Sequence, residues 1–138
     1  MPVPASFVLI HDGRRFLAHV RGQDRKIGIA GGKQERGETL LTTVIRETKE
    51  EYGIILPETE LEYRGYVVNE NNRQVHLYEY RVRDVEEIYQ TVKEKRSRRE
   101  VVQLLMIRLS KQEVERLKES LHNSLYLQLK ELVFGGRR

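Results

Sequence analysis

Residues 32–54 read GKQERGETLLTTVIRETKEEYGI and combine a glycine-containing loop with an amphipathic helix. Apolar residues recur at helical spacing between Thr39 and Tyr52. Gly53 follows at the position where a left-handed residue ends many helices, and Pro57 discourages continuation. This pattern predicts a helix over residues 39–52.

The predicted helix has two different faces. At about 100° per residue, Glu47, Glu50 and Glu51 fall within one arc of roughly 100°. A separate arc carries the residues expected to face a core: Leu41, Val44, Ile45, Thr48 and Tyr52. Like charges at this spacing disfavour an isolated helix, and a hard divalent cation such as Mg²⁺ would relieve the repulsion. A solvent-exposed glutamate-rich face is the alternative, because glutamate is a common exposed helix former.

The spacing of the whole segment resembles the signature of the Nudix hydrolases. Gly32 is followed after five residues by Glu38, and after seven more by the run Arg46–Ile54. Seven specified positions would coincide by chance in roughly one of ten thousand to a hundred thousand such sequences. The resemblance implies an α/β fold, the Nudix-type α/β/α sandwich with a mixed β-sheet, and a single Nudix hydrolase domain over residues 1–138.

The resemblance also implies a role for each matched residue. Glu47, Glu50 and Glu51 match the metal-binding glutamates of the family, and Gly32 matches the glycine whose carbonyl often completes the metal shell. Arg46 matches the arginine that orients the glutamates, and together with Glu47 and Glu50 it forms the expected catalytic set. The implied cofactor is Mg²⁺, with Mn²⁺ as an alternative. Independently, the glycine pair at 31 and 32 permits a close backbone approach.

Two features depart from the family pattern. An aliphatic residue is usual where Thr48 stands, and we expect its methyl group to pack while its hydroxyl bonds a carbonyl of the previous turn. The lead-in to the glycines has Ile27 and Ala30 where an aromatic residue and a proline are frequent. The second change bears on base or sugar recognition more than on catalysis.

Two strand pairs are predicted outside this segment. Asp12-Gly13 suits the tight turn of a hairpin between strands at 6–11 and 15–20. Strands at 61–68 and 74–82 flank a polar loop and predict a second hairpin.

The remaining segments alternate in type. Residues 84–92 are ambiguous, and residues 101–109 predict a buried strand. Ser110 and Glu113 have capping-box spacing, and a last helix is expected from about Asn123. Strands interleaved with helices predict a mixed sheet covered by helices.

A further carboxylate is expected from the C-terminal half, where many Nudix hydrolases supply a metal ligand or general base. Glu100 is the best candidate because it directly precedes the strand at 101–109. Glu79 and the pair Glu86-Glu87 are alternatives. Each of these glutamates could equally be an ordinary surface acid without a role in the reaction.

A basic run, Lys93–Arg99, lies just before Glu100. Arginine forks suit phosphate oxygens, so we assign Arg98 and Arg99 to substrate binding. An RNA-contacting patch and a solvated loop are the alternatives, and no interleaved aromatic residues support sequence-specific contact with nucleic acid.

Composition limits the classes of protein. A chain of 138 residues suits one domain, and the absence of cysteine excludes disulfides, thiolate zinc sites and cysteine nucleophiles. Between Gln34 and Glu62, eight acids and three bases give a net charge of −5. Because the whole chain has a net charge of +4, the remaining residues together carry +9. The start has no basic leader, and no apolar run approaches the roughly 20 residues that span a bilayer. We expect a cytoplasmic protein without a membrane partner.

The sequence therefore predicts a metal-dependent pyrophosphohydrolase that cleaves a diphosphate linkage in a small nucleotide, with nucleoside triphosphates or related nucleoside diphosphate derivatives first. Dinucleoside polyphosphates, ADP-ribose and RNA 5′ ends remain open as substrates. A non-catalytic nucleotide sensor is a second hypothesis, which the complete set of glutamates disfavours. A basic RNA-binding protein is the third, and steep loss of affinity with salt would mark it. A homodimer is also left open.

Overall fold

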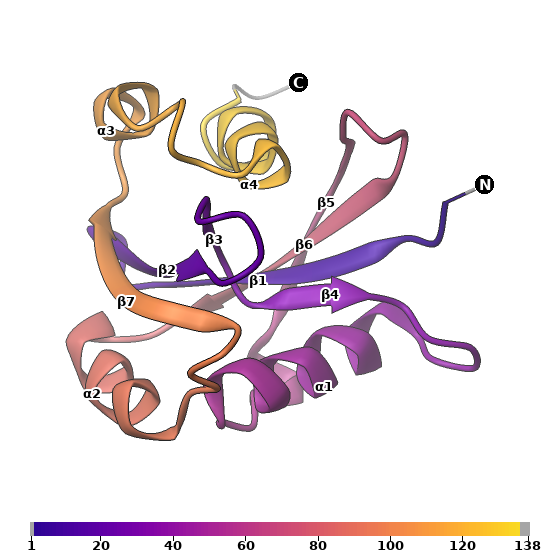
Figure 1. The fold of residues 1–138 in the computed structure, drawn as a ribbon, viewed down its shortest axis with the longest axis horizontal. Coiled ribbons are helices and arrows are strands. Elements are labelled where there is room, and N and C mark those ends of the chain that lie inside the picture. The colour runs from indigo at the N-terminus through magenta and orange to yellow at the C-terminus, as the bar shows by residue number, and fades with distance from the viewer. Residues whose placement is uncertain (1, 136–138) are drawn as a thin grey trace.

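A computed structural model describes residues 2–135, in which seven strands form one mixed sheet (Figure 1). The strands are β1 (Ala5–His11), β2 (Arg15–Arg21), β3 (Ile27–Gly28), β4 (Gly31–Lys33), β5 (Glu62–Val68), β6 (Gln74–Arg81) and β7 (Val101–Arg108). Their order is β3-β2-β1-β6-β5, with β4 added beside β1 and β7 beside β2. The β1–β6 pair is parallel and the other pairs are antiparallel, so the predicted mixed sheet is confirmed.

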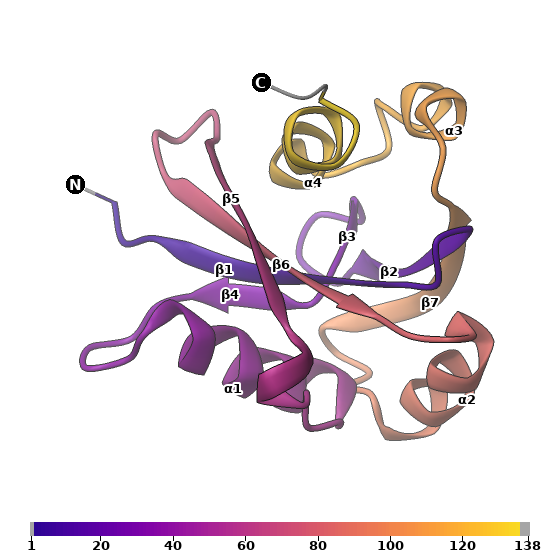
Figure 2. The same cartoon turned by 180° about the vertical axis from the view of Figure 1, so that it is seen from behind.

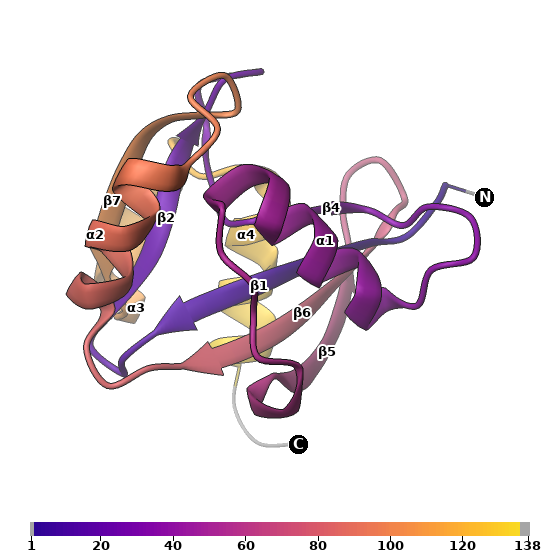
Figure 3. The same cartoon turned by 90° about the horizontal axis from the view of Figure 1, so that it is seen from below.

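Helices cover both faces of the sheet, as Figures 2 and 3 show from behind and from below. They are α1 (Leu40–Tyr52), η1 (Glu58–Glu60), α2 (Val85–Lys95), α3 (Lys111–Arg116), α4 (Asn123–Gln128) and η2 (Leu129–Val133), a π-helical turn that continues α4. The helices α1 and α2 lie on one face, and α3 and α4 lie on the other. This is the α/β/α sandwich expected from the sequence. Within the described part of the chain, no helix is long and apolar enough to cross a bilayer.

Both predicted hairpins are present, but the strands of the first separate soon after their turn. Asp12 accepts the N–H groups of Arg14 and Arg15 at 2.9 Å, and Gly13 has a φ of 91°. Beyond this turn β1 pairs in parallel with β6, whereas β2 pairs with β7. The two strands therefore enter different halves of the sheet.

The segment that the sequence left ambiguous is the helix α2. Asp84 caps it by accepting the N–H of Glu86. This local hydrogen bond favours a helix over a strand at its first turn. The following strand β7 is only half-buried, since Val101, Leu104 and Ile107 are buried and the other residues are partly or fully exposed. The prediction of a buried strand was therefore wrong in degree, because among the described strands β7 pairs with β2 alone and lies at an edge of the sheet.

The capping prediction for α3 is confirmed, because Ser110 accepts the N–H of Glu113 at 3.2 Å. The carboxylate of Glu113 bonds Arg116 within the same helix. The helix expected from about Asn123 begins there as α4.

Two apolar cores lie on opposite faces of the sheet. The core beneath α1 and α2 includes Val8, Ile10, Leu17, Val44 and Tyr52. The core beneath α3 and α4 includes Leu9, Phe16, Leu77, Leu125 and Leu129. Neighbouring residues of β1 face opposite cores, as the alternation of a strand requires. The central strand is thereby held from both sides, and α1 has a fixed platform.

The helix α1 ends where the sequence predicts and begins one residue later, because Thr39 is its N-cap. Thr39 caps it by accepting the N–H of Thr42 at 3.0 Å. Gly53 ends it with a φ of 75°, and its N–H donates to Lys49 O at 3.0 Å.

Two buried threonines of α1 differ in how their hydroxyl groups are bonded. The Thr43 hydroxyl lies 2.9 Å from a Glu38 carboxylate oxygen and 3.0 Å from Thr39 O. The Thr48 hydroxyl has no hydrogen-bond partner among residues 2–135. Our expectation that Thr48 bonds the previous turn was therefore wrong. Its buried oxygen loses contact with water without gaining a protein partner.

We expect Thr48→Val to raise the free energy of unfolding by about 1 kcal/mol, because it replaces an unpaired hydroxyl with a methyl group of similar size. Thr43→Val is the matched control and should lower that free energy by about 1 kcal/mol, because it breaks paired bonds. Urea denaturation of both variants measures the difference. A Thr48→Val protein that is no more stable than Thr43→Val would contradict this account.

Candidate active site

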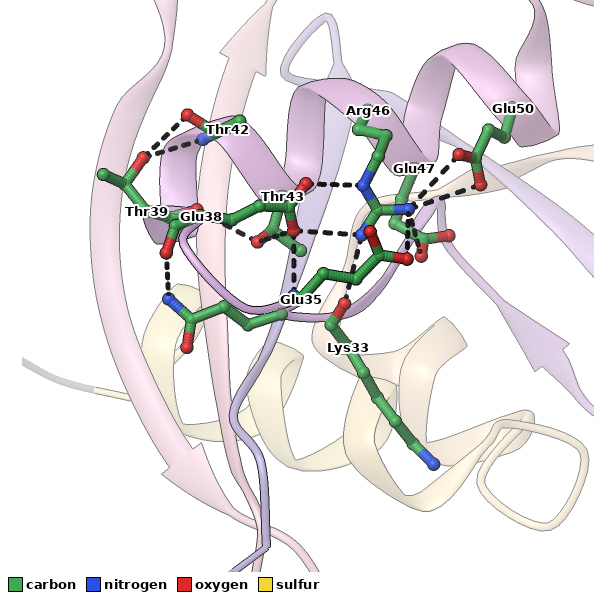
Figure 4. A network of polar contacts seen from close by, with 10 residues as sticks. Lys33, Glu35, Glu38, Thr39, Thr42, Thr43, Arg46, Glu47 and Glu50 are labelled. Atoms are coloured by element: carbon green, nitrogen blue, oxygen red, sulfur yellow. Dashed lines mark hydrogen bonds and ion pairs between the residues drawn. The ribbon is translucent and has the colours of Figure 1, made fainter.

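Arg46 is the centre of a network of ion pairs between α1 and the preceding loop (Figure 4). Its Nε and Nη2 lie 2.6 and 3.0 Å from the two carboxylate oxygens of Glu38, which makes a forked contact. Its Nη1 lies 3.1 Å from Glu47 Oε2 and 3.3 Å from Glu50 Oε2, and Nη2 donates to Lys33 O. One guanidinium therefore ties the loop to the helix and holds two glutamates.

Glu38 is the anchor of this network. The hydrogen bond from Arg46 lowers the pKa of Glu38 to about 2, and the Glu35 N–H and Thr43 hydroxyl also donate to its carboxylate. The pKa of Arg46 is raised in turn by Glu38. Both groups stay charged at every pH near neutrality. The loop is consequently held in place by a permanent ion pair.

The glycine pair at 31 and 32 packs directly against the carboxylates of α1. A Cβ atom on Gly32 would lie 2.4 Å from Glu47 Cδ, so no larger residue fits without displacing that carboxylate. The N–H of Gly31 donates to Glu51 Oε1 at 3.3 Å. This confirms the close backbone approach that the two glycines predict. It turns Glu47 and Glu51 inward, toward β4.

Crowding changes the protonation of these two carboxyl groups. Burial, and then the charge of Glu47, raise the pKa of Glu51 to about 9. Burial also raises the pKa of Glu47, which shares a hydrogen bond with Glu51. At neutral pH the raised pKa therefore keeps Glu51 protonated. Two crowded carboxylates are hard oxygen donors that suit a divalent cation, which would take the place of the proton on Glu51.

The third glutamate of the arc has another partner. Glu50 is exposed and accepts hydrogen bonds from Arg46. Within residues 2–135, no three His, Asp or Glu side chains form a ready-made metal site. The assignment of Gly32, Glu47, Glu50 and Glu51 as metal ligands therefore stays a prediction.

The turn before β7 lies at the C-terminal end of α1, as Figure 1 shows. Ser97 N donates to Glu51 O at 2.8 Å, and Glu100 O accepts the N–H of Gly22 at 3.1 Å. Glu100 itself is exposed, and its charge is one of the causes that raise the pKa of Glu51. The fold thus brings Glu100 into the electrostatic neighbourhood of the carboxylates of α1.

The basic run divides into structural and exposed residues. Arg96 donates to Val101 O at 3.1 Å and to Lys93 O at 2.9 Å, so its side chain joins α2 to β7. Arg98 and Arg99 are exposed in the turn, and no ion pair within the described residues includes them. Their side chains are free to meet an anion.

The other acids considered from the sequence have partners elsewhere. Glu79 bonds His11 and lies 3.3 Å from Arg64 Nε. Glu86 and Glu87 are in the first turn of α2, where each lies near an arginine. Glu100 is therefore the carboxylate of this half that the fold brings to the end of α1.

A polar cavity of about 300 Å³ was not predicted from the sequence. Its lining residues are Asp24, Lys26, Glu70, Lys118, Glu119, Leu121, His122, Asn123 and Tyr126. They come from three connections far apart in the chain, and no motif links them. Ile27 is bonded at this edge by Ser120 O and His122 N, and Gly32 lies five residues further along, at most about 18 Å away.

Comparisons with known proteins agree with this arrangement. A family model described as NUDIX domain matches residues 1–127, whereas no curated protein matches the chain. A MutT protein of Methanosarcina mazei is 20% identical, with a TM-score of 0.64 and coverage of 99% of this chain and 96% of that one. A Nudix hydrolase of Nitrosomonas europaea is 19% identical, with a TM-score of 0.67 and coverage of 100% and 92%.

A longer protein also shares the fold. The chain covers 42% of a bifunctional NMN adenylyltransferase/ADP ribose pyrophosphatase of Francisella tularensis, solved with AMP and a manganese ion. That match includes 99% of this chain, at 14% identity and a TM-score of 0.69. At these identities the solved structures establish the fold alone.

The raised pKa of Glu51 predicts how stability depends on pH without divalent ions. The folded protein keeps this proton up to about pH 9, whereas the unfolded chain releases it near its ordinary value of 4.5. Folding therefore takes up a proton between these values, and the free energy of unfolding should fall as pH rises, by at most about 1.4 kcal/mol per pH unit.

Denaturant unfolding in excess chelator at pH 5, 7 and 9 measures this trend. Glu51→Gln should flatten it, whereas the exposed control Glu87→Gln should leave it unchanged. An unaltered pH dependence in Glu51→Gln would show that other groups cause it.

Proposed function

The chain belongs to the NUDIX domain family, and on this premise we propose that it is a divalent-metal-dependent pyrophosphohydrolase acting on a nucleoside triphosphate or a related nucleoside diphosphate derivative. The observation that carries the proposal is the packing of the Glu47 and Glu51 carboxylates against Gly31 and Gly32. The pKa values of both carboxyl groups are raised, and both groups offer only oxygen atoms to a metal ion. Such a site favours a hard cation.

Glu47 and Glu51 would hold the cation, with Glu50 and the Gly32 backbone as further ligands. When bound, a divalent ion polarises phosphoryl oxygens and makes a bound water more acidic. Glu51 must first give up the proton that it holds at neutral pH, so ion binding should become stronger as pH rises.

Arg46 has a positioning role in this proposal. Its forked contact with Glu38 fixes the guanidinium, which in turn restrains the carboxylates of Glu47 and Glu50. Lysine could not replace it, because one ammonium group cannot make the forked contact and reach both other glutamates.

Arg98 and Arg99 would receive the phosphate groups. Both are exposed, and their turn is joined to the end of α1 through Ser97. Guanidinium groups there offset the charge of a diphosphate that approaches an acidic site.

Glu100 is the proposed general base. A water oxygen attacks one phosphorus atom while Glu100 accepts a proton from that water, and the bond from this phosphorus to the bridging oxygen breaks. The bridging oxygen leaves with the second phosphoryl group. The bridging oxygen takes the electron pair of the broken bond as an anion, and Glu100 releases its proton to solvent, so the one new negative charge on the products is matched by one released proton.

The polar cavity beside Ile27 supports a nucleoside as the organic part of the substrate. Its amide, imidazole and carboxylate groups, which include Asn123, His122 and Asp24, can pair with a base or sugar. ADP-ribose is the second candidate substrate, favoured by the likeness to the ADP ribose pyrophosphatase of Francisella tularensis.

We expect hydrolysis of a nucleotide panel to require added Mg²⁺ or Mn²⁺ and to stop in excess chelator. Glu51→Gln should lower the rate by orders of magnitude while circular dichroism and the melting temperature show a folded protein, because it removes a ligand charge. Glu87→Gln is the matched control and should keep the parental rate. Undiminished turnover with chelator, or near-normal turnover by Glu51→Gln, would place the metal site elsewhere.

Glu100→Gln should lower kcat by about a hundredfold to ten-thousandfold with little change in KM, the usual range for a positioned base. If Glu100 is a ligand instead, a higher metal concentration should partly restore the rate. Steady-state kinetics at several metal concentrations separate these roles. Glu86→Gln is the control, and a larger loss in that variant than in Glu100→Gln would transfer the assignment.

A further inference from the structure

Gly22 makes an unusually close backbone contact with the turn before β7. It follows β2 directly, and its N–H donates to Glu100 O at 3.1 Å. A Cβ atom on Gly22 would lie 2.1 Å from Arg99 O and 3.3 Å from Arg99 C. Because the obstructing atoms are backbone, they cannot rotate away, and a residue with a side chain would push the two segments apart.

A change in strand register creates this contact. β2 pairs regularly with β7 as far as Val20, and the register shifts before Arg21 pairs with Val101. Beyond the shift, Gly22 meets the turn where the ladder ends. The contact is therefore part of the way in which β7 enters the sheet.

The same turn is bonded on its other side to α1. Ser97 N donates to Glu51 O at 2.8 Å, and Val101 N donates to Ser97 O at 2.9 Å. The turn thus lies between the end of β2 and the end of α1. Arg98, Arg99 and Glu100 are carried on this short bridge.

These three side chains have no ion pair within residues 2–135 that could place them. Their positions therefore depend on the backbone of the turn. We infer that Gly22 is a positioning residue for the reaction, because it seats the turn that carries Glu100 and the two arginines at the C-terminal end of α1. This inference rests on the proposed function of that turn.

The first test adds one methyl group at the contact. Gly22→Ala should lower kcat/KM on the order of a hundredfold, the scale expected when catalytic groups move by about 1 Å. Gly28→Ala is the matched control, because its added Cβ meets only the flexible Arg21 side chain, at 3.0 Å. It should keep the parental kinetics.

A change that acts through the turn must lose its effect when the turn carries no functional groups. In the background R98A/R99A/E100Q, adding G22A should therefore cause no further loss of kcat/KM. Losses that multiply in full would show that Gly22 acts elsewhere and would overturn the inference. A parental rate in Gly22→Ala alone would overturn it as well.

The second test does not depend on activity. Trypsin cleavage after Arg98 and Arg99 should be faster by about tenfold or more in Gly22→Ala than in Gly28→Ala, because the displaced turn opens more often. If Gly22→Ala does not fold, hydrogen exchange of the Gly22 amide in the wild-type protein tests the contact instead. The hydrogen bond to Glu100 O should slow this exchange, and rapid exchange would overturn the inference. Wild-type protein that hydrolyses no nucleotide would overturn the proposed function, whereas active wild type with parental Gly22→Ala overturns only the role of Gly22.

Discussion

The approach of α1 to the glycine strand is the constraint on which the site depends. The apolar side of the helix packs through Val44 and Tyr52, which leaves the glutamate arc at the edge of the core. There Gly32 offers only backbone, and the Glu47 carboxylate fills the space that a Cβ would need. The packing that stabilises the fold therefore also buries negative charge. A proton on Glu51 relieves that charge in the metal-free protein.

The surrounding charges divide this acidic group into two parts. Arg46 neutralises the side next to the loop and is itself held by Glu38. Its Nη1 also contacts Glu47, whereas no ion pair within residues 2–135 includes Glu51, whose pKa stays raised. A divalent ion is the natural complement to this half. In the proposed site, the reach of one arginine would therefore leave the Glu51 carboxylate free for the ion.

The remaining parts of the proposed site reach α1 through backbone contacts. The turn that carries Glu100 is fixed between Gly22 and Glu51 O, and neither contact involves a side chain of the turn. The polar cavity is likewise formed where three connections meet beside Ile27. Backbone contacts are stiff, and they leave the exposed side chains of Arg98 and Arg99 available for the proposed contact with substrate.

The sequence alone determined the features that depend on residues close together in the chain. The limits of α1, the two hairpins and the cap of α3 follow from hydrogen bonds that span a few residues, and the spacing from Gly32 to Ile54 identified the family. Only the tertiary structure decided the unpaired Thr48 hydroxyl, the partners of Glu79, the cavity and the contact at Gly22. Each of these depends on segments distant in the chain, whose separation is set by packing across the sheet and leaves no periodic pattern in the sequence.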